Sequence, residues 1–303
     1  MIPFTLRQLE VFTCVAKANS LSSAAKSLYL SKAAVSLSLN QLENQLAHTL
    51  FDRVNNRLIL NQEGMRLLSV ADEVLERARA IPNLFTQSSP EKLSGTLNIG
   101  ASNTIGNQLL PYLIRDFTAQ YPDVKFKTLL ENSAVLSQKV IDYQVDIAFI
   151  ESNQQLDKLT HHPFGFDQMC VICNPDDPLA HRSQVSINDL EERSWLVREL
   201  GSGSRDYFMQ HIAKHTTSWQ EEFVLSSSEA IINSVSAGLG LACLSELSID
   251  SALKAGKISK LNINLPLDRS MQVVLHKDKY LNPLLSAFLH YSLEWRLSDH
   301  PTK

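Results

Sequence analysis

Cysteine, glycine and proline are all scarce in this chain of 303 residues, which has 4 Cys, 10 Gly and 11 Pro. Four cysteines are too few for a disulfide scaffold, and so little Gly and Pro excludes a collagen-like or low-complexity protein. No stretch approaches the ~18 apolar residues that a membrane helix needs, and the first residues do not resemble a signal peptide. We therefore expect a cytoplasmic protein that has no membrane partner.

The chain also lacks the usual motifs of enzymes and metal sites. It contains no GxSxG elbow, Walker loop or HExxH motif, and its histidines lack metal-ligand spacing. Cys170 and Cys173 form a CxxC pair, but in a predicted strand residues three apart point to opposite faces. We expect these cysteines to pack in the core, and the chain to have no metal, no cofactor and no enzymatic activity.

Charge is distributed unevenly along the chain. The formal net charge is −4, yet residues 1–60 hold six Lys or Arg and three Asp or Glu. This segment therefore carries +3 and the remainder −7. A basic N-terminal segment on an acidic body is typical of a small nucleic-acid-binding module attached to another domain. The length allows two or three domains.

The N-terminal segment has the pattern of three short helices. Apolar spacing predicts the first helix over residues 6–18, with an inward face of Leu6, Leu9, Phe12, Val15 and Ala16. Ser22 is a suitable N-cap for a helix over residues 23–28, and Ser31 for a helix that runs to Leu46. Two helices joined by a tight turn indicate a helix-turn-helix.

The third helix has two distinct faces. The buried stripe is expected to consist of Val35, Leu39, Leu42 and Leu46, spaced 4, 3 and 4. The opposite side and its flank carry Lys32, Ala33, Ser36, Leu37 and Asn40. The early residues of such a helix meet base edges in the major groove. The pattern therefore favours DNA binding, with a three-helix packing unit that has a polar face as the alternative.

A wing and a long helix are predicted next. Two β-type runs over residues 51–54 and 57–60 are joined by a turn-forming Asn pair, so Arg53 and Arg57 would face DNA phosphates. Asn61 caps a helix that runs to about residue 80. Its heptad-like stripe is Leu68, Ala71, Leu75 and Ala78. We expect this helix to dimerise, because paired heads read paired half-sites; packing on the parent body is the alternative.

The stretch from LRQLEVF through AAKSLYLSKAAVS and LFDR to the EG pair at residues 63–64 resembles the winged helix-turn-helix of LysR-type transcriptional regulators. The resemblance implies a double-stranded DNA operator, self-association as a homodimer or homotetramer, and base and backbone contacts by Lys32, Ala33, Ser36 and Leu37, with Arg53 on the wing. Many members have Arg or Gln where Leu37 stands. Leu37 can make only apolar contact, so the operator should rely less on G·C there.

The body shows alternating strands and helices, which predict parallel sheets with crossover helices. The expected fold is an all-α winged helix-turn-helix head over residues 1–60, a linker helix over 61–89, and a two-lobed α/β effector domain over 90–303. The resemblance to the LysR family implies that this effector domain is built like a periplasmic binding protein. Lobe I would span about 94–165 and 268–300, and lobe II about 166–267.

Three junctions between strands and helices are rich in hydroxyl groups, and backbone N–H groups at helix N-termini with Ser or Thr hydroxyls form anion sites. If all three face one cleft, the site for a small anionic effector would be formed by Ser102, Asn103, Thr104, Ser202, Gly203, Ser204, Arg205, Ser228 and Glu229. The alternative is that these residues are only N-caps.

Glu151, at the end of a predicted strand, narrows the ligand class. A carboxylate there would repel a fully ionised anion, so the ligand would offer a proton or an ammonium group. Alternatively, Glu151 is an exposed acid or pairs with Arg198 or Arg205. The strings ASNTIGNQLLP, VDIAFIES, RELGSGSRD and SSSEAI are similar to the LysR branch linked to sulfur-oxyanion and cysteine metabolism, and bisulfite fits because it is anionic and carries one donatable hydrogen.

Two classes of function follow from these patterns. The first is a DNA-binding regulator controlled by a small anion. The second is an α/β ligand-binding or enzymatic protein whose N-terminal module serves only assembly. Binding to DNA with a steep salt dependence would distinguish them, because phosphate contacts release counterions.

Overall fold

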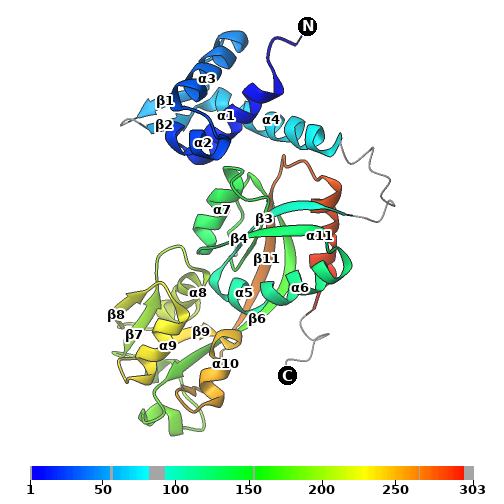
Figure 1. The fold of residues 1–303 in the computed structure, drawn as a ribbon. Coiled ribbons are helices and arrows are strands. Elements are labelled where there is room, and N and C mark those ends of the chain that lie inside the picture. The colour runs from blue at the N-terminus through cyan, green and yellow to red at the C-terminus, as the bar shows by residue number, and fades with distance from the viewer. Residues whose placement is uncertain (1, 55–56, 82–92, 153, 266, 297–303) are drawn as a thin grey trace.

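The computed structural model describes residues 2–54, 57–81, 93–152, 154–265 and 267–296. A helical head with a small hairpin lies at one end of the molecule (Figure 1). Helix α4 leads from this head toward two α/β lobes, which are joined by long strands. No helix in the described part of the chain is long and apolar enough to span a membrane.

The head consists of α1 (Leu6–Ala18), α2 (Leu21–Leu28), α3 (Lys32–Leu46), β1 (Phe51–Val54) and β2 (Arg57–Leu60). The two strands pair antiparallel, as predicted for a wing; the turn at 55–56 lies outside the described residues. Ser31 caps α3 through the backbone N–H of Ala34. The predicted cap of α2 is wrong: Ser20 caps it through Ser23, and Ser22 is exposed in its first turn.

The core of the head confirms most of the predicted inward residues. Leu9, Phe12 and Val15 of α1 are buried with Val35, Leu39 and Leu42 of α3. Leu6 is an exception, because its side chain is 51% exposed at the N-terminus of α1. The stripe on α3 thus packs inward, which leaves the other face of the helix free of the head's core.

Helix α4 (Gln62–Ala80) is capped by Asn61, which accepts a hydrogen bond from the N–H of Gly64. A Cβ at Gly64 would lie 2.1 Å from the carbonyl oxygen of Leu50, so the chain needs glycine here. The stripe predicted for dimerisation faces inward, with Leu68, Ala71 and Leu75 buried in the head's own core. A different face of α4 exposes Val70 and Val74, and the C-cap Ile81 is exposed as well.

Lobe I is built on parallel strands β3 (Gly95–Ala101), β4 (Val124–Leu130) and β5 (Ile147–Ile150). Helices α5 (Asn103–Gln108), α6 (Leu110–Gln120), α7 (Ser133–Ile141) and α11 (Pro283–Glu294) complete it. One continuous helix is predicted over residues 105–121, but the structure breaks it at Leu109. Pro111 explains the break, because proline lacks an N–H group and its ring crowds the carbonyl four residues earlier.

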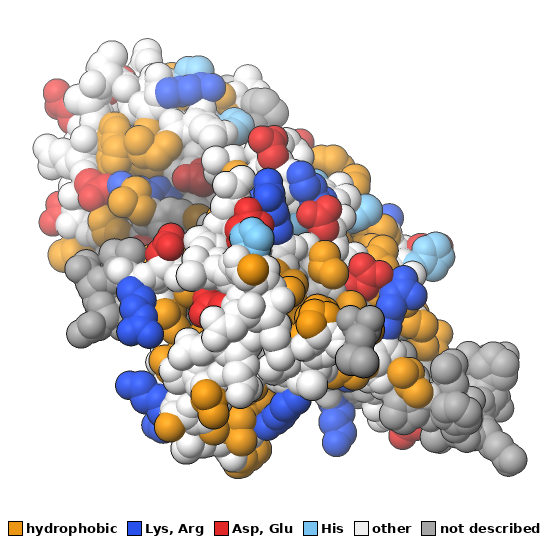
Figure 2. All heavy atoms as spheres, turned by 90° about the horizontal axis from the view of Figure 1, so that it is seen from above, with side chains coloured by type: hydrophobic (Ala, Val, Ile, Leu, Met, Phe, Trp, Pro, Cys, Tyr) orange, Lys and Arg blue, Asp and Glu red, His pale blue; other side chains and the backbone are white. Residues whose placement is uncertain are grey.

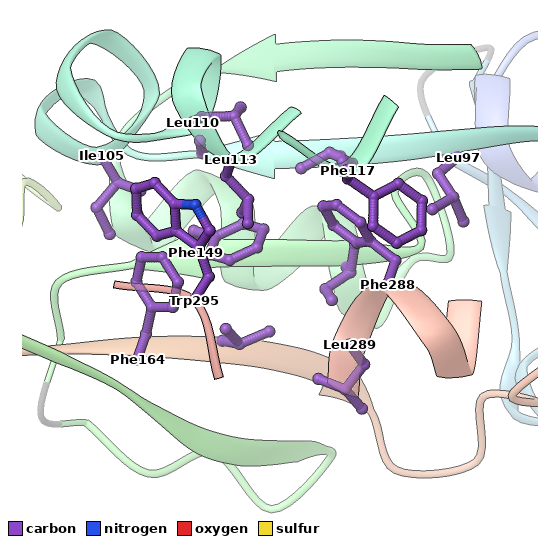
Figure 3. Close-up of a cluster of buried hydrophobic side chains, with 14 of the residues drawn as sticks. Leu97, Ile105, Leu110, Leu113, Phe117, Phe149, Phe164, Phe288, Leu289 and Trp295 are labelled. Atoms are coloured by element: carbon purple, nitrogen blue, oxygen red, sulfur yellow. The ribbon is translucent and has the colours of Figure 1, made fainter. Parts of the chain in front are cut away.

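Aromatic rings fill the core of lobe I (Figure 3). The ring of Phe117 on α6 meets the ring of Phe288 on α11 edge-on, with centroids 5.0 Å apart. Phe164 stacks on Trp295 at 6.3 Å. The last helix of the chain therefore closes the first lobe, as the sequence predicts.

Two long strands join the lobes and make the main sheet mixed rather than purely parallel. β6 (Leu159–Cys173) runs antiparallel to β11 (Asp268–His276) as far as Gln168 and pairs with β9 (Ala242–Ser245) from Met169 onward. The strand order is β10-β6-β11-β5-β3-β4, with β9 on β6 and β10 at Ser259–Lys260. The sequence pattern predicts a strand only over residues 168–173, and β6 begins nine residues earlier, at Leu159.

Lobe II contains the remaining elements. β7 (Ser194–Arg198) and β8 (Gln220–Leu225) pair in parallel, and α8 (Gly203–His211), α9 (Ser228–Ser236) and α10 (Glu246–Lys254) surround the sheet. Short 3-10 turns lie at Pro178–His181, Ile187–Leu190 and Ala213–His215. Cys170 and Cys173 are buried in different clusters on opposite faces of β6 and are not bonded to each other.

Candidate functional site

The outer face of α3 is open to solvent, as predicted. Lys32, Ala33 and Asn40 are exposed, Ser36 is partly buried, and the side chain of Leu37 is 60% exposed. A leucine that is open to solvent on the polar side of an amphipathic helix gains nothing for folding. The face is therefore available to a partner.

Tyr29, which the sequence analysis does not single out, lies beside this face. It ends α2 in the left-handed conformation with φ 54°, and its side chain is 95% exposed. An aromatic side chain in the turn between two short helices, next to Ser27 and Ser31, is the sequence signal that could have identified it. Tyr29 adds a hydroxyl group and a ring to the exposed surface.

The wing presents Arg53 on β1, and this side chain is exposed. Arg57 begins β2 and pairs with Val54, but its side chain lies outside what the structure describes. Seen from the head's end of the molecule, Lys and Arg side chains are spread over the surface and hydrophobic ones form separate small groups (Figure 2).

A buried charged cluster lies where the two lobes meet, with Arg269 of β11 at its centre. Its guanidinium donates to Asp167 of β6 and to Oγ of Ser204 at 3.0 Å. It also approaches Oγ1 of Thr104 at 3.5 Å, and its Nη2 lies 3.7 Å from Oε1 of Glu151. The predicted residues Thr104, Glu151 and Ser204 are thus brought together from three elements by an arginine that was not predicted.

Burial and charge decide the protonation of this cluster. Burial raises the pKa of Asp167 above the usual range for aspartate, although Arg269 opposes the shift. Burial alone would lower the pKa of Arg269, but Glu151 and Asp167 raise it overall. Arg269 therefore stays charged in the folded protein.

Three buried polar atoms at this junction have no hydrogen-bond partner among the described residues. They are Oγ of Ser102, Oε1 of Glu151 and Nε of Arg269. Each of these residues is at most 4% exposed. A buried polar atom without a partner costs free energy, so such a group indicates a missing ligand or water.

Two cavities border the junction and divide the predicted residues between them. One of about 470 Å³ is lined by Glu151, Gly203, Tyr207 and Arg269, among others. A second, of about 500 Å³, is lined by Asn103, Ser228 and Glu229. Ser202, which precedes Gly203 of the first cavity, is buried. Gly203 lets the start of α8 lie against the backbone of Glu151, because a Cβ at this position would lie 2.0 Å from the carbonyl oxygen of Glu151.

The two arginines considered as partners of Glu151 are engaged elsewhere. Arg198 pairs with Glu199 at 2.8 Å and donates to Oγ of Ser228 at 3.3 Å. Arg205 donates to the carbonyl of Arg198 and to Glu221. The alternative, in which Glu151 is an exposed acid or pairs with Arg198 or Arg205, is therefore wrong, because Glu151 is buried and lies beside Arg269.

The architecture defines a class: a winged helix-turn-helix joined by a helix to a two-lobed binding domain. Comparisons with known proteins give the family. Residues 6–65 match the model "Bacterial regulatory helix-turn-helix protein, lysR family", and residues 90–296 match "LysR substrate binding domain". The chain belongs to the LysR family of transcriptional regulators.

Individual relatives agree with this assignment. The chain is 38% identical over 288 residues to the "Uncharacterized HTH-type transcriptional regulator YeiE" of Escherichia coli, covering 95% of this chain and 96% of the relative. It is 30% identical over 262 residues to the "HTH-type transcriptional regulator CysL" of Bacillus subtilis, covering 84% and 85%. These relatives are named as transcriptional regulators and not as enzymes.

Among solved structures, full-length OxyR from Pseudomonas aeruginosa aligns with a TM-score of 0.74 at 22% identity, over 96% of this chain and 94% of that one. The regulatory domain of CcmR from Synechocystis, in complex with 2-PG, aligns with a TM-score of 0.62 at 24% identity, over 66% and 96%. At this identity the match shows the fold alone.

Proposed function

We propose that the outer face of α3 and the wing bind an operator in double-stranded DNA. Lys32, Ala33, Ser36, Leu37 and Asn40 would face the major groove, and Arg53 and Arg57 the phosphates. The observation that carries the proposal is the division of α3 into a buried stripe and an open face that includes a solvent-exposed Leu37.

The salt dependence of DNA affinity tests this docking. The full chain is titrated against DNA from upstream of its own gene, by fluorescence anisotropy at several salt concentrations. Each phosphate contact adds ~0.9 to the slope of log K against log salt, so Arg53→Ala should reduce the slope by about 1 without changing the base preference. Lys254→Ala, in lobe II, is the matched control. An unchanged slope for Arg53→Ala would remove the wing from the interface.

We propose further that the cleft between the lobes, which is the cavity lined by Glu151, Gly203 and Arg269, binds a small oxyanion that carries a hydrogen. Bisulfite is the best candidate. The observation that carries this proposal is a set of buried atoms without a hydrogen-bond partner among the residues that the structure describes: Nε of Arg269 is a donor, Oε1 of Glu151 an acceptor, and Oγ of Ser102 can be either. A ligand with several acceptor oxygens and one donatable hydrogen fits Nε of Arg269 and Oε1 of Glu151, whose residues line the same cavity. The resemblance to the sulfur-linked branch supports the same class, and the match to CysL agrees with it.

Discrimination between related anions tests the ligand class. In titration calorimetry near neutral pH, sulfite should bind and sulfate should not, because sulfate offers no hydrogen to Glu151. Glu151→Gln replaces the acceptor oxygen by an amide that can donate, so sulfate should gain affinity relative to sulfite. Glu222→Gln, an exposed acid on β8, is the control. If Glu151→Gln binds both anions as the parent does, Glu151 has no part in recognition.

Self-association is the third part of the proposal. The exposed apolar residues Val70 and Val74 of α4 and Ile81, its C-cap with helical backbone angles, lie four and seven residues apart, which places them on one helical face. We propose that this face, rather than the stripe that contains Leu68, contacts the same helix of a partner copy.

The alternative in which the N-terminal module serves only assembly predicts no salt-dependent DNA binding.

A further inference from the structure

A buried network of ion pairs connects the head of this chain to lobe I of the same chain. Nζ of Lys279, from the loop after β11, lies 2.7 Å from Asp72 of α4 and 2.9 Å from Asp146 of lobe I. Asp72 also accepts from Lys17 of α1 at 2.8 Å. The side chains of Lys279 and Asp72 are 3% and 5% exposed. Two cations and two anions balance each other across the junction.

Tyr143 makes a second contact at this junction between the head and lobe I. It follows α7, yet its ring is 4% exposed and packs with the core of the head. Its hydroxyl oxygen lies 2.9 Å from Nδ1 of His276, at the end of β11. The backbone of Tyr143 is left-handed with φ 55°, a conformation that favours glycine at this position after a helix. A bulky residue is held there because its ring is inserted into the head.

Polar contacts continue along α4. Nδ2 of Asn282 donates to Glu76 at 2.8 Å, and the guanidinium of Arg77 lies 4.4 Å from the centre of the Tyr280 ring. The loop from residue 277 to 282 thus contacts successive turns of α4. The contact is made of specific, directional interactions and not only of surface proximity.

Three elements of lobe I connect this junction to the cleft between the lobes. At one end of α7, Oγ of Ser133 lies 3.3 Å from both the N and the O of Glu151, and at the other end stands Tyr143. β5 has Asp146 before it and Glu151 after it. β11 has Arg269 near its start and is followed by Lys279. β5 and β11 therefore each connect a residue of the charged cluster to a residue of the head junction, and α7 connects Ser133, which contacts Glu151, to Tyr143, which follows the helix.

We propose that Lys279 and Tyr143 couple the cleft to the DNA-binding head of the same subunit, so that a change at Glu151 or Arg269 alters how the head is held on lobe I. This inference rests on the proposed function, in which the cleft binds a ligand. A ligand that shifts Glu151 relative to Arg269 shifts β5 and α7, because Glu151 directly follows β5 and is held by Ser133 at the start of α7. The head then experiences a change in its contacts at Asp72 and around the Tyr143 ring.

Hydrogen exchange on the full chain tests the coupling without requiring a known ligand or operator. The cleft is perturbed by Glu151→Gln, and exchange is followed over α4, residues 62–80. We expect the exchange rates of α4 to change about five-fold or more, the lower end of ordinary allosteric coupling. In the Lys279→Met background and in the Tyr143→Gly background, Glu151→Gln should change them less than ~2-fold.

The variants are chosen so that the result has one meaning. Tyr143→Gly removes the ring, and glycine readily adopts the left-handed backbone conformation of this position. This second variant keeps the test valid if Lys279→Met does not fold. Lys277→Met, at an exposed position of the same loop, should leave the response to Glu151→Gln intact. Unchanged α4 exchange in Glu151→Gln, or a response that persists in both junction variants, overturns the inference.

Hydrogen exchange measured with and without sodium sulfite distinguishes the coupling from the ligand proposal. Protection of residues 199–205 by sulfite together with altered exchange in α4 supports both. Protection of the cleft without any change in α4 refutes the coupling and leaves the ligand proposal standing. If sulfite protects nothing, the ligand class is wrong, and the Glu151→Gln comparison still decides the coupling.

Discussion

Two leucines of α3 should respond differently to the same substitution. Leu42 is fully buried in the head, whereas Leu37 is 60% exposed on the outer face of α3. Leu42→Ala removes buried carbon atoms worth roughly 0.8 kcal/mol for each methylene group, and the cavity left behind brings the total to about 2–5 kcal/mol. Leu37→Ala removes little buried surface, so its effect on stability should remain within about 0.5 kcal/mol.

The assay follows the stability of the head and its DNA affinity in the same full-length protein. The chain has several cores, so a single unfolding transition does not report the head alone; hydrogen exchange in α1 and α3 does. Leu42→Ala should accelerate that exchange by more than ten-fold, because about 1.4 kcal/mol corresponds to one factor of ten. Leu37→Ala should leave exchange unchanged and weaken binding to the chain's own upstream DNA. If Leu37→Ala instead destabilises the head and spares DNA binding, the outer face is covered in the working assembly and the docking is wrong.

Three further outcomes follow from the geometry. Gly64→Ala places a Cβ 2.1 Å from the carbonyl oxygen of Leu50, so hydrogen exchange in α1 and α3 should show the head destabilised by roughly 1–3 kcal/mol or more. Val70→Lys puts a charge on the exposed apolar face of α4 and should shift the mass measured by light scattering from dimer toward monomer; an unchanged dimer would place the contact elsewhere. Burial alone would raise the pKa of Asp72, but Lys279 and Lys17 lower it overall, so its stabilising effect is complete above the usual aspartate value of about 3.9. That effect should be lost as pH falls through the lowered pKa, and acid melts of Asp72→Asn should lack this part of the pH dependence.

Local patterns were enough to predict the head. The 4, 3, 4 spacing of the α3 stripe, the caps Ser31 and Asn61 and the two wing strands depend on neighbours in sequence, and the structure confirms all of them. The start of α2 was wrong by two residues because Ser20 and Ser22 are both suitable caps. The structure selects Ser20, since the left-handed Asn19 ends α1 immediately before it.

The linker helix shows why an apolar stripe does not identify its partner. The stripe through Leu68 and Leu75 was correctly recognised as apolar, but spacing alone does not distinguish a partner helix from the helix's own domain. In the structure α1 occupies that face, and Asp72, one position beyond Ala71, pairs with Lys17 of α1. Whether α4 dimerises remains a prediction, now on the face of Val70.

The cleft was only partly predictable, and the limit is set by chain topology. The junctions at Thr104, Glu151 and Ser204 can be found locally, because hydroxyl groups and an acid follow apolar strands. Arg269 cannot, because it stands in a strand that otherwise reads as core, and its partner Asp167 is 102 positions away. The chain crosses between the lobes once at β6 and again at β11. Every contact that β11 and its following loop make with the first half of the chain therefore spans long separations, up to the 207 positions between Lys279 and Asp72. The arginine that organises the charged cluster and the lysine that holds the head are ten residues apart on one strand and its loop, and only the folded chain shows what either of them touches.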